Sequence, residues 1–155
     1  MTDELDLLIL DALQKNGRLK RNELAELVGL SLPAASDRLR KLEERGFIKG
    51  YAAILDPAKF GKDITAFVQV SVDTSLHYEN FLRHVQQNPE ILECHAITGD
   101  GSHLLKIRTD NTAALEHVLS QIQSWKEVEH TRTSVVLSTT KETLNINISS
   151  SPTQA

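Results

Sequence analysis

The sequence has few of the features that mark secreted or membrane-spanning proteins. It holds one cysteine, Cys94, so no disulfide can form within the chain, and a reducing compartment is expected. No apolar run approaches the ~20 residues that a transmembrane helix needs. The acidic start at residues 1–6 lacks the basic residues that open a signal peptide. We therefore expect a cytoplasmic protein with no membrane partner.

Motifs for metal binding and catalysis are also missing. The six histidines form no His-x-x-x-His pair and no Cys/His cluster. Cys94 and His95 are neighbours in an expected strand, so their side chains should point to opposite faces. No nucleophile elbow accompanies the Ser, His and Asp residues. We expect no metal, no cofactor and no enzymatic activity, and we interpret Trp125 as a packing or interface residue.

What is present is a globular composition with an uneven charge distribution. The 155 residues suffice for one large or two small domains, and 40% hydrophobic and 25% charged residues are globular values. The net charge is −4, yet residues 15–49 alone carry +4 and residues 51–155 carry −4. A basic segment joined to an acidic remainder favours a phosphate-facing surface on the N-terminal part only.

Helical periodicity predicts three helices in the basic part of the chain, at residues 3–15, 21–28 and 32–45. The turn at residues 29–31 separates the second helix from the third, and Gly46 suits the left-handed position after the last turn. Two short helices joined by a glycine-containing turn are typical of a helix-turn-helix. The apolar positions that define the expected buried sides are Leu5, Leu8, Ile9, Ala12, Leu13, Leu24, Ala25, Leu27, Val28, Leu32, Ala35, Leu39 and Leu42.

The third helix is expected to be the recognition helix, with small residues near its start and basic ones after them. Arg38 is suited to bidentate binding of guanine, and Asp37 to accepting from a cytosine amino group; the alternative is contact mostly with phosphate, or simple solvation. Lys49 lies in a weakly alternating stretch that suggests a hairpin or wing. The DNA-contact candidates are Lys20, Arg21, Ser31, Pro33, Ala34, Ser36, Asp37, Arg38, Arg40, Lys41 and Lys49.

The second half of the chain alternates as strands and helices in the order β-α-β-β-α-β, the ferredoxin-like arrangement. Both helices should cover one face of a four-stranded antiparallel sheet, which leaves the other face, with Phe67, for a second copy of the sheet. The predicted strands are 64–73, 91–98, 103–109 and 128–138, and the helices 75–88 and 111–124. The expected domains are 1–50 (helix-turn-helix), 51–63 (linker hairpin), 64–145 (ferredoxin-like) and 146–155 (flexible tail).

In the order and spacing of several short motifs, the chain resembles the Lrp/AsnC family of feast/famine transcriptional regulators. The motifs are 5–10 (LDLLIL), 16–18 (NGR), 23–25 (ELA), 28–31 (VGLS), 38–43 (RLRKLE), 46–51 (GFIKGY), 93–95 (ECH), 98–100 (TGD), 104–106 (LLK) and 131–133 (TRT). The resemblance implies an α+β protein with an N-terminal, winged-helix-like helix-turn-helix domain and a C-terminal ferredoxin-like βαββαβ domain. It implies double-stranded DNA as partner, self-association as dimer and octamer, and an amino acid or similar effector.

The family's effector site lies between dimers, and the resemblance places it at the loop Gly99–His103 and near the end of the last strand. The candidate residues are Gly99, Asp100, Gly101, Ser102, His103, Ser134 and Val136. Gly99 and Gly101 offer backbone N–H groups to a carboxylate, or they merely serve a hairpin turn. The family loop is usually Gly-Asp-x-Asp-Tyr, so here Ser102 replaces an acid and His103 a tyrosine. A hydroxyl gives an uncharged contact where a carboxylate would receive an ammonium group.

Lys20 or Arg21 stands at the start of the second helix, where the family often has Ser or Thr. Neither side chain can accept a capping hydrogen bond, but either can reach phosphate. We expect a sequence-specific, nucleoid-associated regulator modulated by an effector. Two alternatives remain open: a nucleoid-type DNA-wrapping protein with little sequence choice and no effector, and a ferredoxin-like enzyme or metal sensor that uses the histidines.

Overall fold

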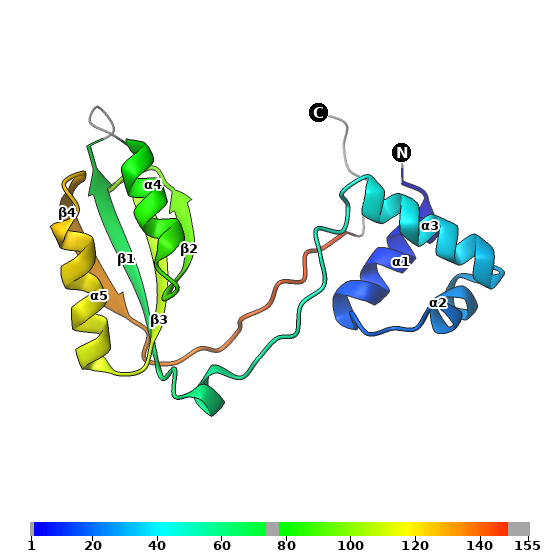
Figure 1. Cartoon of the computed structure of the whole chain (residues 1–155). Helices are drawn as coiled ribbons and strands as arrows, with labels where there is room; N and C mark the ends of the chain where they lie inside the picture. Colours follow the sequence, from blue (N-terminus) through cyan, green and yellow to red (C-terminus); the bar gives the residue numbers. More distant parts are fainter. Residues whose placement is uncertain (1, 74–77, 149–155) are drawn as a thin grey trace. The chain divides into compact units, whose positions relative to one another are not determined.

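The computed structural model describes residues 2–73 and 78–148. The chain forms two compact units, residues 2–54 with 141–148 and residues 55–140. Each unit has its own core of buried apolar side chains, and Figure 1 shows their helices and strands. Within the described ranges, no helix has both the length and the apolar character needed to cross a bilayer.

The first unit contains the three predicted helices, α1 (Glu4–Lys15), α2 (Arg21–Val28) and α3 (Leu32–Glu44). Ile9, Leu24 and Leu42 are fully buried between them, because apolar residues three and four positions apart form one stripe on each helix. Three leucines predicted to be buried are instead about half exposed: Leu8, Leu27 and Leu32. A compact three-helix unit is too small to cover every apolar position of its helices.

Local hydrogen bonds set the helix boundaries. Asp3 and Asp6 form a reciprocal capping box at the start of α1. The Ser31 hydroxyl accepts from the Ala34 N–H at 3.4 Å and caps α3 as predicted, whereas the Lys20 side chain makes no cap bond to α2. Gly46 has φ +75°, and the Phe47 N–H closes the end of α3 onto the Leu42 carbonyl.

The predicted linker hairpin at residues 51–63 is wrong. Residues 48–56 form no strand, and the short 3₁₀ helix η1 (Pro57–Phe60) follows them. A side-chain hydrogen bond holds the start of this segment, where a hairpin would have backbone hydrogen bonds between two strands. The Tyr51 hydroxyl donates to the Glu43 carboxylate at 2.9 Å. Burial and this bond raise the pKa of Tyr51 to about 12. Lys49 therefore lies in an exposed, irregular segment and not in a wing.

The second unit is the predicted α+β, ferredoxin-like domain. Its elements, in chain order, are β1 (Ile64–Val72), α4 (Tyr78–Gln87), β2 (Ile91–Ala96), β3 (His103–Thr109), α5 (Thr112–Ser124) and β4 (Val128–Val135). The strands lie in the order β2-β3-β1-β4 and all pairs are antiparallel. Residues 75–77, predicted to open the α4 helix, lie outside the described residues.

Helices α4 and α5 cover one face of the sheet (Figure 1). Ala66, Val68 and Val70 point into the core beneath them, and Phe81 of α4 is fully buried there. The alternation of β1 is therefore as predicted. Phe67 points to the opposite face and remains 36% exposed.

The last described segment belongs with the helices of the first unit. Residues from Lys141 onward group with that unit, so the boundary falls earlier than the predicted residue 145. The Gln14 side-chain amide donates to the Ile146 carbonyl at 2.9 Å and accepts from the Ile146 N–H at 3.0 Å. The predicted flexible tail thus begins with a residue that is hydrogen-bonded to α1, while 149–155 lie outside the described residues.

Candidate nucleic-acid interface and ligand loop

The exposed side of α3 starts with small residues. Ser31, Pro33 and Ala34 are exposed, whereas Ala35 in the same turn is fully buried. The buried side chains Ala35, Leu39 and Leu42 fix which side of the helix faces the core. Small side chains at the helix start allow a close approach by a bulky partner such as the wall of a DNA groove.

Basic residues on the outer side of α3 are paired with acids of the same helix. Asp37 accepts from Arg40 and from Lys41, each at 2.6 Å, and Arg40 also pairs with Glu44 at 2.6 Å. These pairs hold the pKa of Asp37 below its usual range, Lys41 contributing more than Arg40. All of them are substantially exposed, and exposed pairs one turn apart stabilise a helix only weakly. Arg40 and Lys41 can therefore exchange these partners for phosphate at little cost.

Arg38 has a different environment from its neighbours. Its Nη1 lies 2.7 Å from Oδ2 of Asp3, the N-cap residue of α1, and 2.8 Å from Oδ1 of Asp6 within α1. The Arg38 pKa is raised, first by Asp3 and then by Asp6. The predicted bidentate contact with guanine would require this side chain to leave two carboxylates. In the structure, the Arg38 side chain therefore points toward α1. Ser36, another predicted DNA contact, is half-buried.

Two further cations stand at the start of α2. Lys20 is its N-cap residue, and Arg21 is its first residue. Both side chains are exposed, as is Lys49 beyond α3. The Glu23 carboxylate accepts from the Lys20 backbone N–H at 2.7 Å, which is one half of a capping box. The Lys20 ammonium can only donate, so it takes no part in capping the helix, and its exposed position suits contact with an external anion.

The predicted ligand loop is a tight turn between β2 and β3. Gly99 and Gly101 have φ of +107° and +148°, conformations that L side chains rarely adopt. The Gly101 N–H donates to the Gly99 carbonyl at 2.9 Å and the Ser102 N–H to the Val70 carbonyl at 3.0 Å. The Gly101 N–H is thus already bonded and does not point outward as the predicted carboxylate cradle requires. Asp100 is exposed at the tip.

Ser102 and His103 are hydrogen-bonded inside the domain. The Val72 N–H donates to Ser102 Oγ at 2.9 Å, and Ser102 Oγ lies 3.2 Å from the Val70 carbonyl. His103 Nδ1 lies 2.9 Å from Ser102 Oγ, and His103 Nε2 lies 2.8 Å from the Tyr78 hydroxyl. Two arrangements satisfy these groups. With the proton on Nδ1, His103 donates to Ser102, Ser102 donates to Val70 and Tyr78 donates to His103; with the proton on Nε2, His103 donates to Tyr78, Ser102 donates to His103 and the Val70 carbonyl still accepts from the Ser102 N–H.

Each arrangement has a neutral His103, with one ring nitrogen donating and the other accepting. Only 4% of His103 is exposed, and its ring packs 4.9 Å from the Phe81 ring, centroid to centroid. Burial accordingly lowers the pKa of His103. Sequence reasoning placed His103 among ligand-binding residues, but its alternation with Leu105 and Ile107 already indicated the core side of β3.

The two parts of the predicted effector site do not meet within one chain. The loop reaches Val70 of β1 through Ser102, whereas Ser134 of β4 pairs with Phe67 and the Val136 N–H bonds to the Thr65 carbonyl. Phe67 lies three positions before Val70 along β1, a spacing of about 10 Å.

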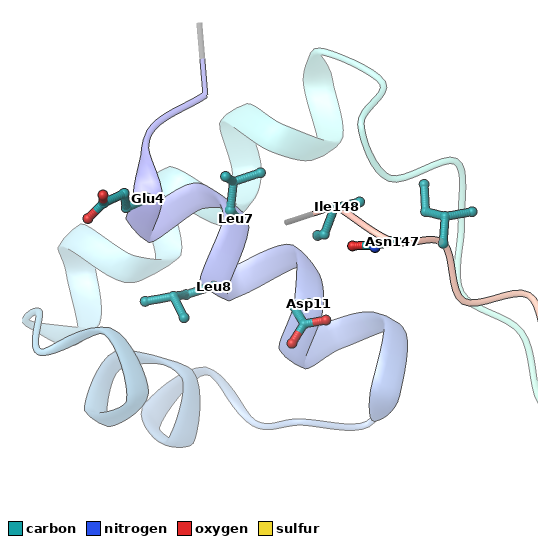
Figure 2. A pocket seen from close by; sticks show the side chains of 7 residues that line it. Glu4, Leu7, Leu8, Asp11, Asn147 and Ile148 are labelled. Carbon is teal, nitrogen blue, oxygen red and sulfur yellow. The ribbon is translucent and has the colours of Figure 1, made fainter. Parts of the chain in front are cut away.

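Sequence reasoning missed a groove on the first unit. It lies between α1 and the final described segment, as Figure 2 shows for Leu7, Leu8 and Ile148. Glu4 and Asp11 stand at its rim. The alternation of Leu144, Ile146 and Ile148 was a signal for an extended segment with one apolar side. No set of three His, Cys, Asp or Glu residues in the described ranges is placed to hold a metal ion.

Comparison with known proteins agrees with both units. Residues 65–146 match the family model of the Lrp/AsnC ligand binding domain, and residues 2–49 match that of a winged helix-turn-helix DNA-binding domain. The HTH-type transcriptional regulator FL11 of Pyrococcus horikoshii is 38% identical over 146 residues, which are 94% of this chain and 96% of that protein. The leucine-responsive regulatory protein of Escherichia coli is 37% identical over 143 residues, 90% of this chain and 87% of that protein.

Solved structures give the same result. A transcriptional regulator of Neisseria meningitidis, crystallised as a complex with L-Met, is similar with a TM-score of 0.92 and 35% sequence identity. The match covers 96% of this chain and 98% of that one. The similarity therefore includes the helical unit and the sheet unit together.

Proposed function

Because this chain belongs to the Lrp/AsnC family and is a DNA-binding transcriptional regulator with a ligand-binding domain, we propose that it binds specific duplex sequences through α3 and the start of α2. The observation that carries this proposal is the division of α3 into a buried apolar side and an exposed side of small and basic residues. The proposed contacts are Ser31, Pro33 and Ala34 toward the groove, and Lys20, Arg21, Arg40, Lys41 and Lys49 toward phosphate.

The proposal is tested by selecting duplexes from a randomised pool with the purified full chain. A sequence-specific regulator enriches one motif and binds it at least a thousandfold more tightly than unselected DNA, the lower end of the range for specific binding. Similar affinity for selected and unselected duplexes supports instead the nucleoid-type wrapping protein. One observation favours that alternative, which has no effector: the Ser102 and His103 side chains are hydrogen-bonded within the domain and are therefore not available to a ligand.

We propose an amino acid or similar small molecule as the effector, since the Neisseria relative is described as an L-Met complex and the E. coli relative as leucine-responsive. In this chain, the groups left for such a ligand are the Asp100 carboxylate and the backbone around Gly99, with Ser134 and Val136 supplied by another protomer. A thermal-shift screen of the common amino acids tests this proposal. A ligand that binds only the folded state raises the melting temperature. At a hundredfold excess over Kd, such a ligand adds about 2.7 kcal/mol to the free energy of unfolding.

We also propose self-association through the uncovered sheet face. Phe67 and Leu104 lie there among charges of both signs, with Glu93 bonded to Lys106 at 3.2 Å. A face carrying both signs of charge around an aromatic residue is suited to pairing with a second copy of itself. Sedimentation of wild type and of Phe67→Glu tests this: the variant should sediment as a smaller species. Identical sedimentation contradicts the proposal, and the sizes found distinguish dimer from octamer.

A further inference from the structure

We propose that Arg38 is a positioning residue, which holds α3 at a fixed rotation against α1 so that its outer side can meet DNA. The inference rests on the proposed function, DNA binding through α3. In this inference, Arg38 does not contact a base; it orients α3, the helix that contacts the DNA. We call Arg38 with Asp3 and Asp6 the clasp.

The clasp joins a recognition-helix side chain to the capping box of α1. The carboxylates of Asp3 and Asp6 each accept the other residue's backbone N–H, at 2.9 and 3.4 Å. The same two carboxylates receive Arg38 Nη1 at 2.7 and 2.8 Å. One nitrogen between two carboxylates that are themselves fixed by the helix start has little freedom to move. The contact therefore fixes a point on α3 relative to the axis of α1.

Burial makes this contact hard to give up. The Asp6 side chain is 11% exposed, whereas Asp37 and Glu44, the partners of Arg40, are 44% and 58% exposed. Removing Arg38 leaves a nearly buried carboxylate without its cation, which is much more costly than losing an exposed pair. The pairs of Arg40 and Lys41 lie within α3 itself, so they cannot orient α3 against another helix.

The position of the clasp determines which side chains of α3 face the DNA. Ala34, Asp37 and Lys41 line a groove together with Asp3, Asp6 and Arg38, so the clasp lies in the same row of residues as the proposed DNA contacts. Side chains on one helix move together, because the backbone hydrogen bonds keep their relative angles. Rotation of α3 about its axis would carry Ala34 and Lys41 with Arg38.

Asp6→Asn gives the sharpest test because two explanations predict opposite signs. It removes a negative charge next to a surface that faces phosphate, so long-range electrostatics alone predicts tighter DNA binding. The clasp predicts weaker binding, since the neutral amide no longer holds Arg38. Asp11→Asn is the matched control: Asp11 also lies on α1, loses the same charge, and pairs with residues of α1 itself, the exposed Lys15 at 2.6 Å and the half-buried Gln14.

The experiment measures affinity for the duplex that the wild type selects, and for each single-base-pair variant of it, at fixed salt. We expect Asp6→Asn and Arg38→Ala to weaken binding to all of these duplexes alike, by about tenfold, the size of one broken network contact. The double variant should be no weaker than Arg38→Ala, because both changes break the same contact. Asp11→Asn should bind as tightly as wild type or tighter.

Unfolding of the full chain tests the clasp independently of DNA. Far-UV circular dichroism follows the helices of both units, while fluorescence of Trp125, the one tryptophan, follows the sheet unit alone; a circular dichroism transition without a matching Trp125 transition therefore reports the helical unit. The effects of Asp6→Asn and Arg38→Ala on the unfolding equilibrium should be non-additive by roughly tenfold, with the Trp125 transition unchanged. If Asp6→Asn does not fold, Asp3→Asn, whose side chain is 54% exposed, takes its place.

Two results overturn the inference. If Arg38→Ala loses discrimination at one base pair while Asp6→Asn keeps wild-type affinity, Arg38 reads a base. If the unfolding effects simply add, the clasp does not couple the helices. If no duplex is bound by the wild type but the unfolding coupling is present, the proposed function fails and the clasp survives as a contact between helices, without its role in DNA binding.

Discussion

The outer side of α3 and the loop Gly99–His103 both carry polar residues that family resemblance assigns to binding, but they use those groups differently. On α3, Arg40 and Lys41 pair with exposed acids of their own helix. In the loop, Ser102 and His103 form partly buried hydrogen bonds to groups of β1 and α4. Exposed pairs exchange partners at little cost, whereas buried hydrogen bonds do not. A polar residue in a family's motif is therefore a binding residue only if its hydrogen-bonding groups are still available in the fold.

The largest expected effect is on DNA affinity when exposed cations are removed. Lys20→Ala with Lys41→Ala should weaken binding roughly eightfold per lost phosphate contact at 0.1 M salt. The slope of log affinity against log salt should become less negative by about 0.9 for each contact. Fluorescence anisotropy over a salt series measures both. Lys59→Ala with Lys126→Ala changes the charge equally on the second unit; an equal loss there would show that net charge, and not the α3 surface, decides affinity.

The next largest effect should come from Ser102→Ala in the loop. The change leaves the Val72 N–H and His103 Nδ1 without their hydrogen-bond partner, and each unsatisfied buried group costs about 1–3 kcal/mol. Urea unfolding followed by Trp125 fluorescence should show this loss of stability, while DNA binding by the folded protein persists. Ser138→Ala, at an exposed position after β4, is the control. If Ser102→Ala is as stable as the wild type, the fold does not need the Ser102 hydroxyl, and this group is again a candidate for ligand binding.

A smaller effect is expected from pH. Burial lowers the pKa of His103, so the unfolded chain binds a proton that the folded chain does not, once the pH falls below the ordinary value of about 6.5. His103 therefore favours the folded state fully above pH 6.5, and this contribution declines as the pH falls toward the lowered pKa. Melting temperatures between pH 7.5 and 5.5 should fall more steeply for wild type than for His103→Gln. His117→Gln, at an exposed position on α5, is the control.

The smallest effect should come from Gln14→Ala at the groove of Figure 2. This change removes both hydrogen bonds to the Ile146 backbone, worth about 1 kcal/mol each at most in an exposed position. Amide hydrogen exchange at Ile146 should accelerate without a change in global stability. Gln86→Ala, exposed on α4, should leave that exchange rate as it is. Unchanged exchange in Gln14→Ala would mean that this segment is held by its apolar side chains alone.

Periodicity predicted the elements well because each helix and strand must bury one side. The α2 helix at residues 21–28 and the strand His103–Thr109 were placed at their observed bounds. The errors occur where local pattern and available partners disagree. The alternation after Gly46 suggested a hairpin, but residues 48–56 form no strand with any part of the chain that the structure describes. Leu32 fits the apolar stripe of α3, yet about half of its surface stays exposed.

The amino-acid sequence by itself determined the two-unit α+β architecture, the helix-turn-helix and the family. Spacing of apolar residues, glycines and caps acts over a few residues, and it is read directly from the chain. Only the tertiary structure decided which polar side chains are available. Arg38 faces two acids 32 and 35 residues earlier, and Ser102 faces strand residues 30 and 32 positions away. Such partners are brought together by packing, and no local pattern encodes them.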